Sequence, residues 1–122
     1  MSGDNVAYEK AEKARQARVK RLELQEALWT LDTLGLAPLK RLASTQPDGF
    51  GPEWSRWLAE LRAAEEKAVS DLTARGARIV KAGELTEFRF AKIAAVSSSG
   101  VGQAMRNWAK KVHKRLAMGA AQ

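Results

Sequence analysis

The side chains with the clearest capacity for chemistry are the cations and amides between residues 88 and 118. This segment holds seven basic residues and no Asp or Glu. The basic residues are Arg89, Lys92, Arg106, Lys110, Lys111, Lys114 and Arg115. A surface that is merely solvated usually mixes charges of both signs, so we expect this segment to bind a partner with repeated negative charge. The plainer alternative is a helical hairpin whose basic face contacts only solvent.

Nucleophilic, acid–base and metal chemistry find little support in the sequence. There is no cysteine, which excludes disulfides and thiolate metal sites, and His113 alone cannot build a histidine cluster. Glu65 and Glu66 are neighbours in a predicted helix, so their carboxylates point to different faces and do not form an acid/base pair. Residues 97–100 lack the Gly-x-Ser-x-Gly context of a nucleophile, and the Gly-x-Gly at 100–102 is isolated. We expect no catalytic residue, no cofactor and no metal, and a protein that is not an enzyme.

Two short helices joined by a tight turn are predicted to position the basic segment. The first helix is expected over residues 87–95 and the second over residues 99–117. Ser98 or Ser99 can cap the second helix by accepting from its free backbone N–H groups. Met105 and Trp108 are expected to be buried between the two helices.

The same segment resembles the helix-turn-helix of prokaryotic and phage-type regulators over residues 79–111. Ala91 matches the small residue midway along the first helix, and the pair 96–97, Val-Ser, matches the apolar residue and Ser that follow it. Val101 matches the aliphatic residue that faces the first helix. The chain departs from the pattern at Ala95, where Gly is usual, and at Ala104, where a larger residue is usual.

This resemblance implies which residues contact DNA. In that family the second helix enters the major groove with its N-terminal part nearest the bases. The implied base-reading residues are Ser98, Ser99, Gln103 and Arg106. The implied phosphate-contacting residues are Arg89, Lys92, Asn107, Lys110, Lys111, Lys114 and Arg115. Gln suits adenine and Arg suits guanine, and the implied inward residues are Ala91, Ala94, Val96 and Val101.

Composition agrees with an anionic partner for a single small domain. The 122 residues carry a formal net charge of +7, with a pI near 10.1. Six basic residues and one acidic residue, Glu12, lie between residues 10 and 21, which forms a second basic segment. No apolar run approaches the roughly 18 residues of a membrane helix, and residues 1–8 lack a signal-peptide apolar region. We therefore expect a cytoplasmic, nucleoid-associated protein.

Helix signals run through almost the whole chain, so the predicted fold class is all-α. A helical domain is expected over residues 19–118, with helices at 19–34, 37–44, 52–81, 87–95 and 99–117. Residues 1–18 form a basic N-terminal arm, for which an ordered helix and a flexible arm both remain open, and residues 119–122 form a tail. Trp54 and Trp57 share one helical stripe and are expected in the core.

The leading hypothesis is sequence-specific binding of double-stranded DNA by a small transcriptional regulator or DNA-positioning accessory protein of a phage, plasmid or chromosome. A homodimer is expected because a single motif reads only a half-site. The alternative is a non-enzymatic helical interaction module, an inhibitor or assembly adaptor, that presents its basic face to a protein partner. A third possibility is non-specific binding of RNA or single-stranded DNA.

Overall fold

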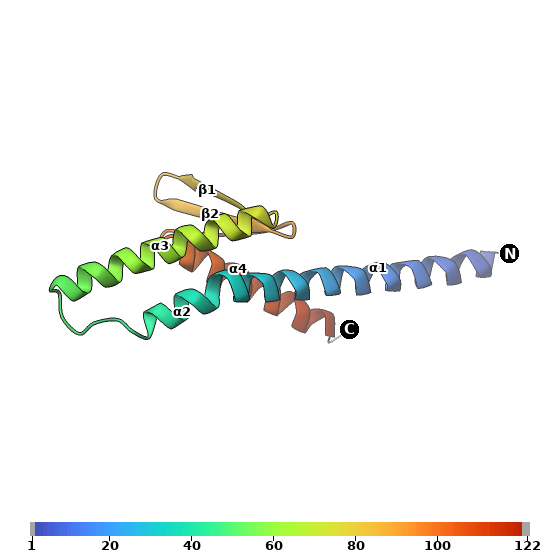
Figure 1. The fold of residues 1–122 in the computed structure, drawn as a ribbon. Coiled ribbons are helices and arrows are strands. Elements are labelled where there is room, and N and C mark those ends of the chain that lie inside the picture. Colours follow the sequence, from blue (N-terminus) through green and yellow to red (C-terminus); the bar gives the residue numbers. More distant parts are fainter. Residues whose placement is uncertain (1, 121–122) are drawn as a thin grey trace.

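The computed structural model describes residues 2–120, with side chains described from 5 to 118. Four α-helices and a three-stranded antiparallel sheet make up the fold, with the sheet packed on α4 at one side of the molecule, and α1 continues directly into a short π-helix, η1 (Figure 1). The elements are α1 (Ser2–Leu31), η1 (Asp32–Leu36), α2 (Ala37–Ala43), α3 (Pro52–Ala74), β1 (Arg78–Ala82), β2 (Leu85–Phe90), β3 (Ile93–Ser97) and α4 (Val101–Ala120). The expected arm at 1–18 is the first half of α1 from residue 2 onward. Of the expected tail, residues 121 and 122 lie outside the described part, as does residue 1.

The prediction of an all-α fold is wrong, because residues 78–97 form a sheet. The helix expected over 52–81 ends at Ala74, where Gly76 takes a left-handed conformation at φ +99°. The Gly76 N–H then donates to the Thr73 carbonyl and the Ala77 N–H to the Leu72 carbonyl, which is the usual glycine-terminated helix end. The helix expected over 87–95 is replaced by β2 and β3. The two-helix geometry implied by the family resemblance therefore does not form in residues 2–120.

The sheet is a meander in the order β1-β2-β3, and its side chains alternate between core and solvent. Phe88 and Phe90 face inward from β2, and Ile93 and Ala95 face inward from β3. Of the four residues expected to face inward, Val101 is buried. Ala91 and Val96 are exposed and Ala94 is half-buried, because they lie in the turn or on the outer face of β3.

The turn between β2 and β3 has only two residues, Ala91 and Lys92, and both have positive φ, at 50° and 65°. This is the conformation of a type I′ hairpin turn, in which Asn-Gly is the preferred pair. The Trp108 indole N–H supports it from α4 by donating to the carbonyls of Phe90 (3.1 Å) and Ile93 (3.0 Å). The hairpin is thus fastened to α4 at its strained end.

The core lies between the inner face of the sheet, α4 and the junction of α1 with η1. Its largest fully buried side chains are Trp108, Phe88, Leu31, Leu72, Met105 and Val112. Burial of Met105 and Trp108 is as predicted, although Trp108 packs on the Phe side chains of β2 and Met105 lies close to Gly35 of η1. Trp54 and Trp57 are only half-buried and lie outside this core, contrary to the prediction.

Helix α1 extends well beyond the body. Its side chains from Asn5 to Lys20 are exposed, apart from the half-buried Glu12. Figure 1 shows this part of α1 extending past the end of α4, while the loop between α2 and α3 lies at the opposite end of the molecule. Good helix formers (Ala, Glu, Lys, Arg) dominate the extension, so local propensity favours its helical state.

Candidate nucleic-acid interface

A groove lies between α1 and the C-terminal half of α4, and its charged lining is basic. Its volume is about 520 Å³. The lining residues are Ala14, Ala17, Arg18, Lys20, Arg21, Leu24, Arg115 and Leu116. The Arg21 guanidinium donates to the Leu116 carbonyl at 3.1 Å and so links the two helices. Arg18, Lys20 and Arg115 are exposed.

A second hollow of about 230 Å³ continues this groove toward the β2–β3 turn. It is lined by Lys20, Glu23, Leu24, Ala91, Lys92, Ile93 and Arg115. Lys20, Leu24 and Arg115 line both hollows, which makes the surface continuous. We call this surface the basic groove. Its five cations are Arg18, Lys20, Arg21, Lys92 and Arg115, and its acidic lining residue is Glu23.

The basic groove depends on contacts between distant parts of the sequence. Helix α1 supplies Arg18, Lys20 and Arg21, and α4 supplies Arg115. Lys92 is placed by the tight turn, which Trp108 holds through its two hydrogen bonds. Hairpin geometry and core packing therefore set the position of this cation.

The residues predicted to read bases lie elsewhere. Ser98 and Ser99 are exposed in the loop before α4, and the Ser99 N–H donates to the Ser97 hydroxyl at 2.9 Å. On α4, Gln103 lies 12 positions before Arg115, which corresponds to about 18 Å along the helix. The predicted base-reading residues are therefore not part of the basic groove.

Gln103, Arg106 and Asn107 bind one another along the N-terminal half of α4. The Arg106 guanidinium donates twice to Gln103 Oε1, at 3.1 and 2.9 Å, and Gln103 Nε2 donates to Asn107 Oδ1 at 2.9 Å. Asn107 Nδ2 in turn donates to the Val96 carbonyl at 3.0 Å. These amides are already engaged with protein partners, which reduces what they can offer to a base edge.

The predicted phosphate-contacting residues divide into four groups. Lys92 and Arg115 meet in the basic groove, whereas Lys110 and Lys114 are exposed elsewhere along α4. Lys111 Nζ donates to the Ala94 carbonyl at 2.7 Å, so that with Asn107 it binds the open edge of β3. Arg89 projects from the outer face of the sheet, where it pairs with Glu87 at 3.3 Å.

Three residues of the basic groove were not predicted as site residues: Arg18, Lys20 and Arg21. Their signal was present in the charge count of residues 10–21. The sequence does not reveal that this segment is a helix packed beside Arg115. Only the fold relates the two basic segments.

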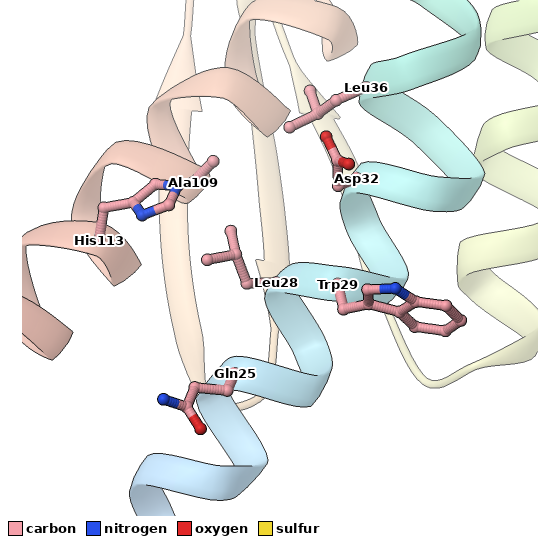
Figure 2. A pocket seen from close by; sticks show the side chains of 7 residues that line it. All are labelled: Gln25, Leu28, Trp29, Asp32, Leu36, Ala109 and His113. Atoms are coloured by element: carbon pink, nitrogen blue, oxygen red, sulfur yellow. The ribbon is translucent and has the colours of Figure 1, made fainter.

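Another open groove, of about 430 Å³, lies between the α1–η1 junction and α4 (Figure 2). Its lining residues are Gln25, Leu28, Trp29, Asp32, Leu36, Ala109 and His113. Figure 2 shows Leu28 and Ala109 between His113 and Asp32, so the polar groups are separated by an apolar floor. Among the described residues no group of three or more His, Cys, Asp or Glu could hold a metal ion.

Within residues 2–120, no helix is both long and apolar enough to cross a membrane. No family model, curated protein or solved structure matches this chain.

Proposed function

We propose that this protein binds nucleic acid through the phosphate backbone and has no enzymatic role. The observation that carries the proposal is the convergence of five cations from α1, the β2–β3 turn and α4 on the basic groove, with Glu23 as its acidic lining residue. Cations arranged along a groove match a polymer with a negative charge at every residue. Lys110 and Lys114, two further exposed cations of α4, add to the attraction.

Binding of phosphates in the groove predicts how steeply the binding constant falls with salt concentration. Each phosphate neutralised releases condensed counterions, so the logarithm of the binding constant falls with the logarithm of salt concentration by about 0.9 per contact on duplex DNA. If all five cations of the groove contact phosphates, the slope is about −4 to −5. A partner bound by one or two surface ion pairs gives a much shallower slope.

The proposal is tested by fluorescence anisotropy with labelled oligonucleotides over a series of salt concentrations. Arg115→Ala is expected to weaken binding and to reduce the slope by about one unit. The matched control is Lys67→Ala, because Lys67 is an exposed cation on α3 outside the basic groove. Binding that is absent even at low salt, or equal losses for both variants, contradicts the proposal.

A second function, self-association, is favoured by the aromatic tip, which we define as Phe50, Trp54 and Trp57. Phe50 is 87% exposed, and its ring contacts that of Trp54 with centroids 5.1 Å apart. Trp54 stacks further on Trp57 at 5.2 Å. Aromatic side chains exposed in this way are enriched in interfaces. Asp48 and Arg56 flank the tip in sequence, and their opposite charges suit an isologous contact between two copies.

Sedimentation velocity tests this second function. The wild-type chain is expected to dimerise with rising concentration, and Phe50→Ser is expected to remain monomeric. Trp29→Ser is the control, because Trp29 is also exposed but lies on α1. A monomeric wild-type chain at all accessible concentrations contradicts self-association, and this outcome leaves nucleic-acid binding unaffected.

A further inference from the structure

The extended part of α1, residues 5–20, is a helix whose side chains are almost all exposed, so its surface is open to a binding partner. Over 16 residues it spans about 24 Å. A single helix of this length gains little from burial and is marginal by itself. Its larger apolar residues are Val6, Tyr8 and Val19, and at about 100° per residue Val6 falls on the side opposite to the other two. They do not form a continuous apolar stripe on one face of the helix. This surface is therefore poorly suited to packing against an apolar partner.

From Glu9 to Glu26, charge is instead segregated around the axis of α1. At about 100° per residue, the six basic residues between 10 and 21 occupy an arc of about 220°. They are Lys10, Lys13, Arg15, Arg18, Lys20 and Arg21. The four glutamates of the helix, Glu9, Glu12, Glu23 and Glu26, all fall in the remaining arc.

Cations lie on both flanks of this basic arc. Lys13 and Lys20 lie on one flank, and Arg15 and Arg18 lie on the other, with Lys10 and Arg21 between them. A helix resting on a flat anionic surface needs cations on one narrow face. A helix inside a groove has phosphates on both walls and therefore needs cations on both flanks, as here. Small side chains such as Ala7 and Ala14 lie between the flanks and leave room for close approach.

We infer that α1 inserts into the major groove of B-form DNA. This inference rests on the nucleic-acid binding proposed above. That groove is about 12 Å wide and admits an α-helix, whose diameter with side chains is about 10–12 Å. The major groove of A-form RNA is too narrow and deep for side chains to read, and a single strand has no groove. Duplex DNA is therefore the class of nucleic acid that fits.

The position of the body supports this assignment. The same side of α1 that carries the cations also faces Arg115, since Ala14, Ala17, Arg18 and Arg115 line one groove. DNA that receives the N-terminal part of α1 thus brings its flanking phosphates toward Arg115 and toward Lys92 in the adjoining hollow. Because α4 lies beside this side of α1 from Ala14 to Leu24, the part of α1 that enters the DNA groove is the part before Ala14, and the basic groove contacts the phosphates next to it.

The experiment compares three probes of one sequence, duplex DNA, duplex RNA and single-stranded DNA, at a single salt concentration. We expect duplex DNA to bind at least about 10-fold more tightly than the other two. A fourth probe, duplex DNA that carries glucosylated hydroxymethylcytosine, fills the major groove with sugar and is expected to lose most of this advantage.

A matched pair of variants tests the orientation of the helix. Ala11→Phe adds bulk inside the basic arc and is expected to weaken binding to duplex DNA by about 10-fold or more, since it holds the helix out of the groove. Gln16→Phe adds the same bulk on the glutamate side and is expected to change affinity less than about 2-fold. Both positions are exposed, so neither variant disturbs the core.

The outcomes separate this inference from the proposed function. Equal affinity for all probes, or equal effects of the two variants, overturns insertion in the major groove while nucleic-acid binding stands. Absence of binding to every probe at low salt overturns both. If Ala11→Phe instead dissociates a dimer of the free protein, α1 binds a second copy and the inference is wrong.

Discussion

Substitutions at Lys92 can separate the effect of backbone strain in the β2–β3 turn from the effect of the lysine charge. The residue has φ +65° and is exposed, and its side chain lines the basic groove. Replacement by Gly removes both the Cβ atom that makes this conformation costly and the ammonium group. Replacement by Ala removes the ammonium group but keeps the Cβ atom. Comparison of Lys92→Gly with Lys92→Ala therefore isolates the strain.

The expected difference follows from two opposing contributions. A left-handed conformation costs an L-residue about 1–2 kcal/mol relative to Gly. Gly loses more backbone entropy on folding, about 0.5–1 kcal/mol relative to Ala. Lys92→Gly should therefore raise the free energy of unfolding by about 0.5–1 kcal/mol, or the melting temperature by about 2–6 °C. Lys92→Ala should stay within about 0.5 kcal/mol of wild type.

Urea unfolding followed by circular dichroism measures the stability, and anisotropy titration measures the affinity. Both variants are expected to lose affinity for duplex DNA equally and to reduce the salt slope by about one unit, since both lack the same cation. If Lys92→Gly is no more stable than Lys92→Ala, the turn is not strained as argued. If the two differ in affinity by more than about 2-fold, the shape of the turn, and not the ammonium group, controls binding.

Three further predictions concern α4 and its surroundings. Trp108→Phe should lower the free energy of unfolding by about 2–3 kcal/mol in urea titration, because the fully buried indole loses both its hydrogen bonds to the turn and part of its volume; a loss below about 0.5 kcal/mol contradicts its role in supporting the turn. Gly35→Ala should cost no more than about 2 kcal/mol in the same assay, since the new Cβ atom meets Met105 Sδ at 3.2 Å and a Leu72 methyl at 3.3 Å, while the higher helix propensity of Ala returns about 0.5–1 kcal/mol. Gln103→Ala and Arg106→Ala should each change affinity for specific and random duplexes by less than about 2-fold; a selective loss on one DNA sequence restores their base-reading role.

Helix prediction succeeded where apolar periodicity and stop signals agreed. The start of α3 was expected at residue 52, where it begins, and α4 was expected within a few residues of its observed start, but the end of α3 was expected at residue 81 and lies at Ala74. These features depend on local backbone preference and on amphipathic spacing, both of which a single sequence carries. The expected interruption at Gly35 was too early a stop, however, because η1 passes through Gly35 and continues into α2.

The three-stranded meander was not predicted, because its sequence lacks clear signals for the strands and for the turn. Residues 91–95, Ala-Lys-Ile-Ala-Ala, favour a helix locally, and an Ala-Lys turn lacks the Asn-Gly signature of a two-residue hairpin. The alternation in 86–90, Thr-Glu-Phe-Arg-Phe, was the available signal. Burial of Phe88 and Phe90 against Trp108 outweighs the helix propensity of the neighbouring alanines, and that tertiary contribution cannot be read from the segment itself.

Of the basic groove, Lys92 and Arg115 were predicted as phosphate contacts, though in a helix-turn-helix, and the cations of α1 were predicted only as an excess of charge. An excess of cations in residues 10–21 and 88–118 was sufficient to expect an anionic partner. The meeting of Lys20, Lys92 and Arg115 depends on the hairpin and on the packing of α1 along α4. Such long-range placement follows from the fold as a whole, which is why charge was predicted and geometry was not.

The residues of the β2–β3 turn, Ala91 and Lys92, are not those that give the most stable turn. Stability alone favours Asn-Gly there, because each non-glycine residue at positive φ costs about 1–2 kcal/mol. The hairpin tolerates Ala91 and Lys92 because Trp108 binds both flanking carbonyls and because the two Phe side chains pack against its indole. A glycine at position 92 relieves strain but removes one of the cations that line the basic groove with Arg115. If the proposed function is correct, the charge of Lys92 accounts for a strained lysine at this corner, where the fold alone favours glycine.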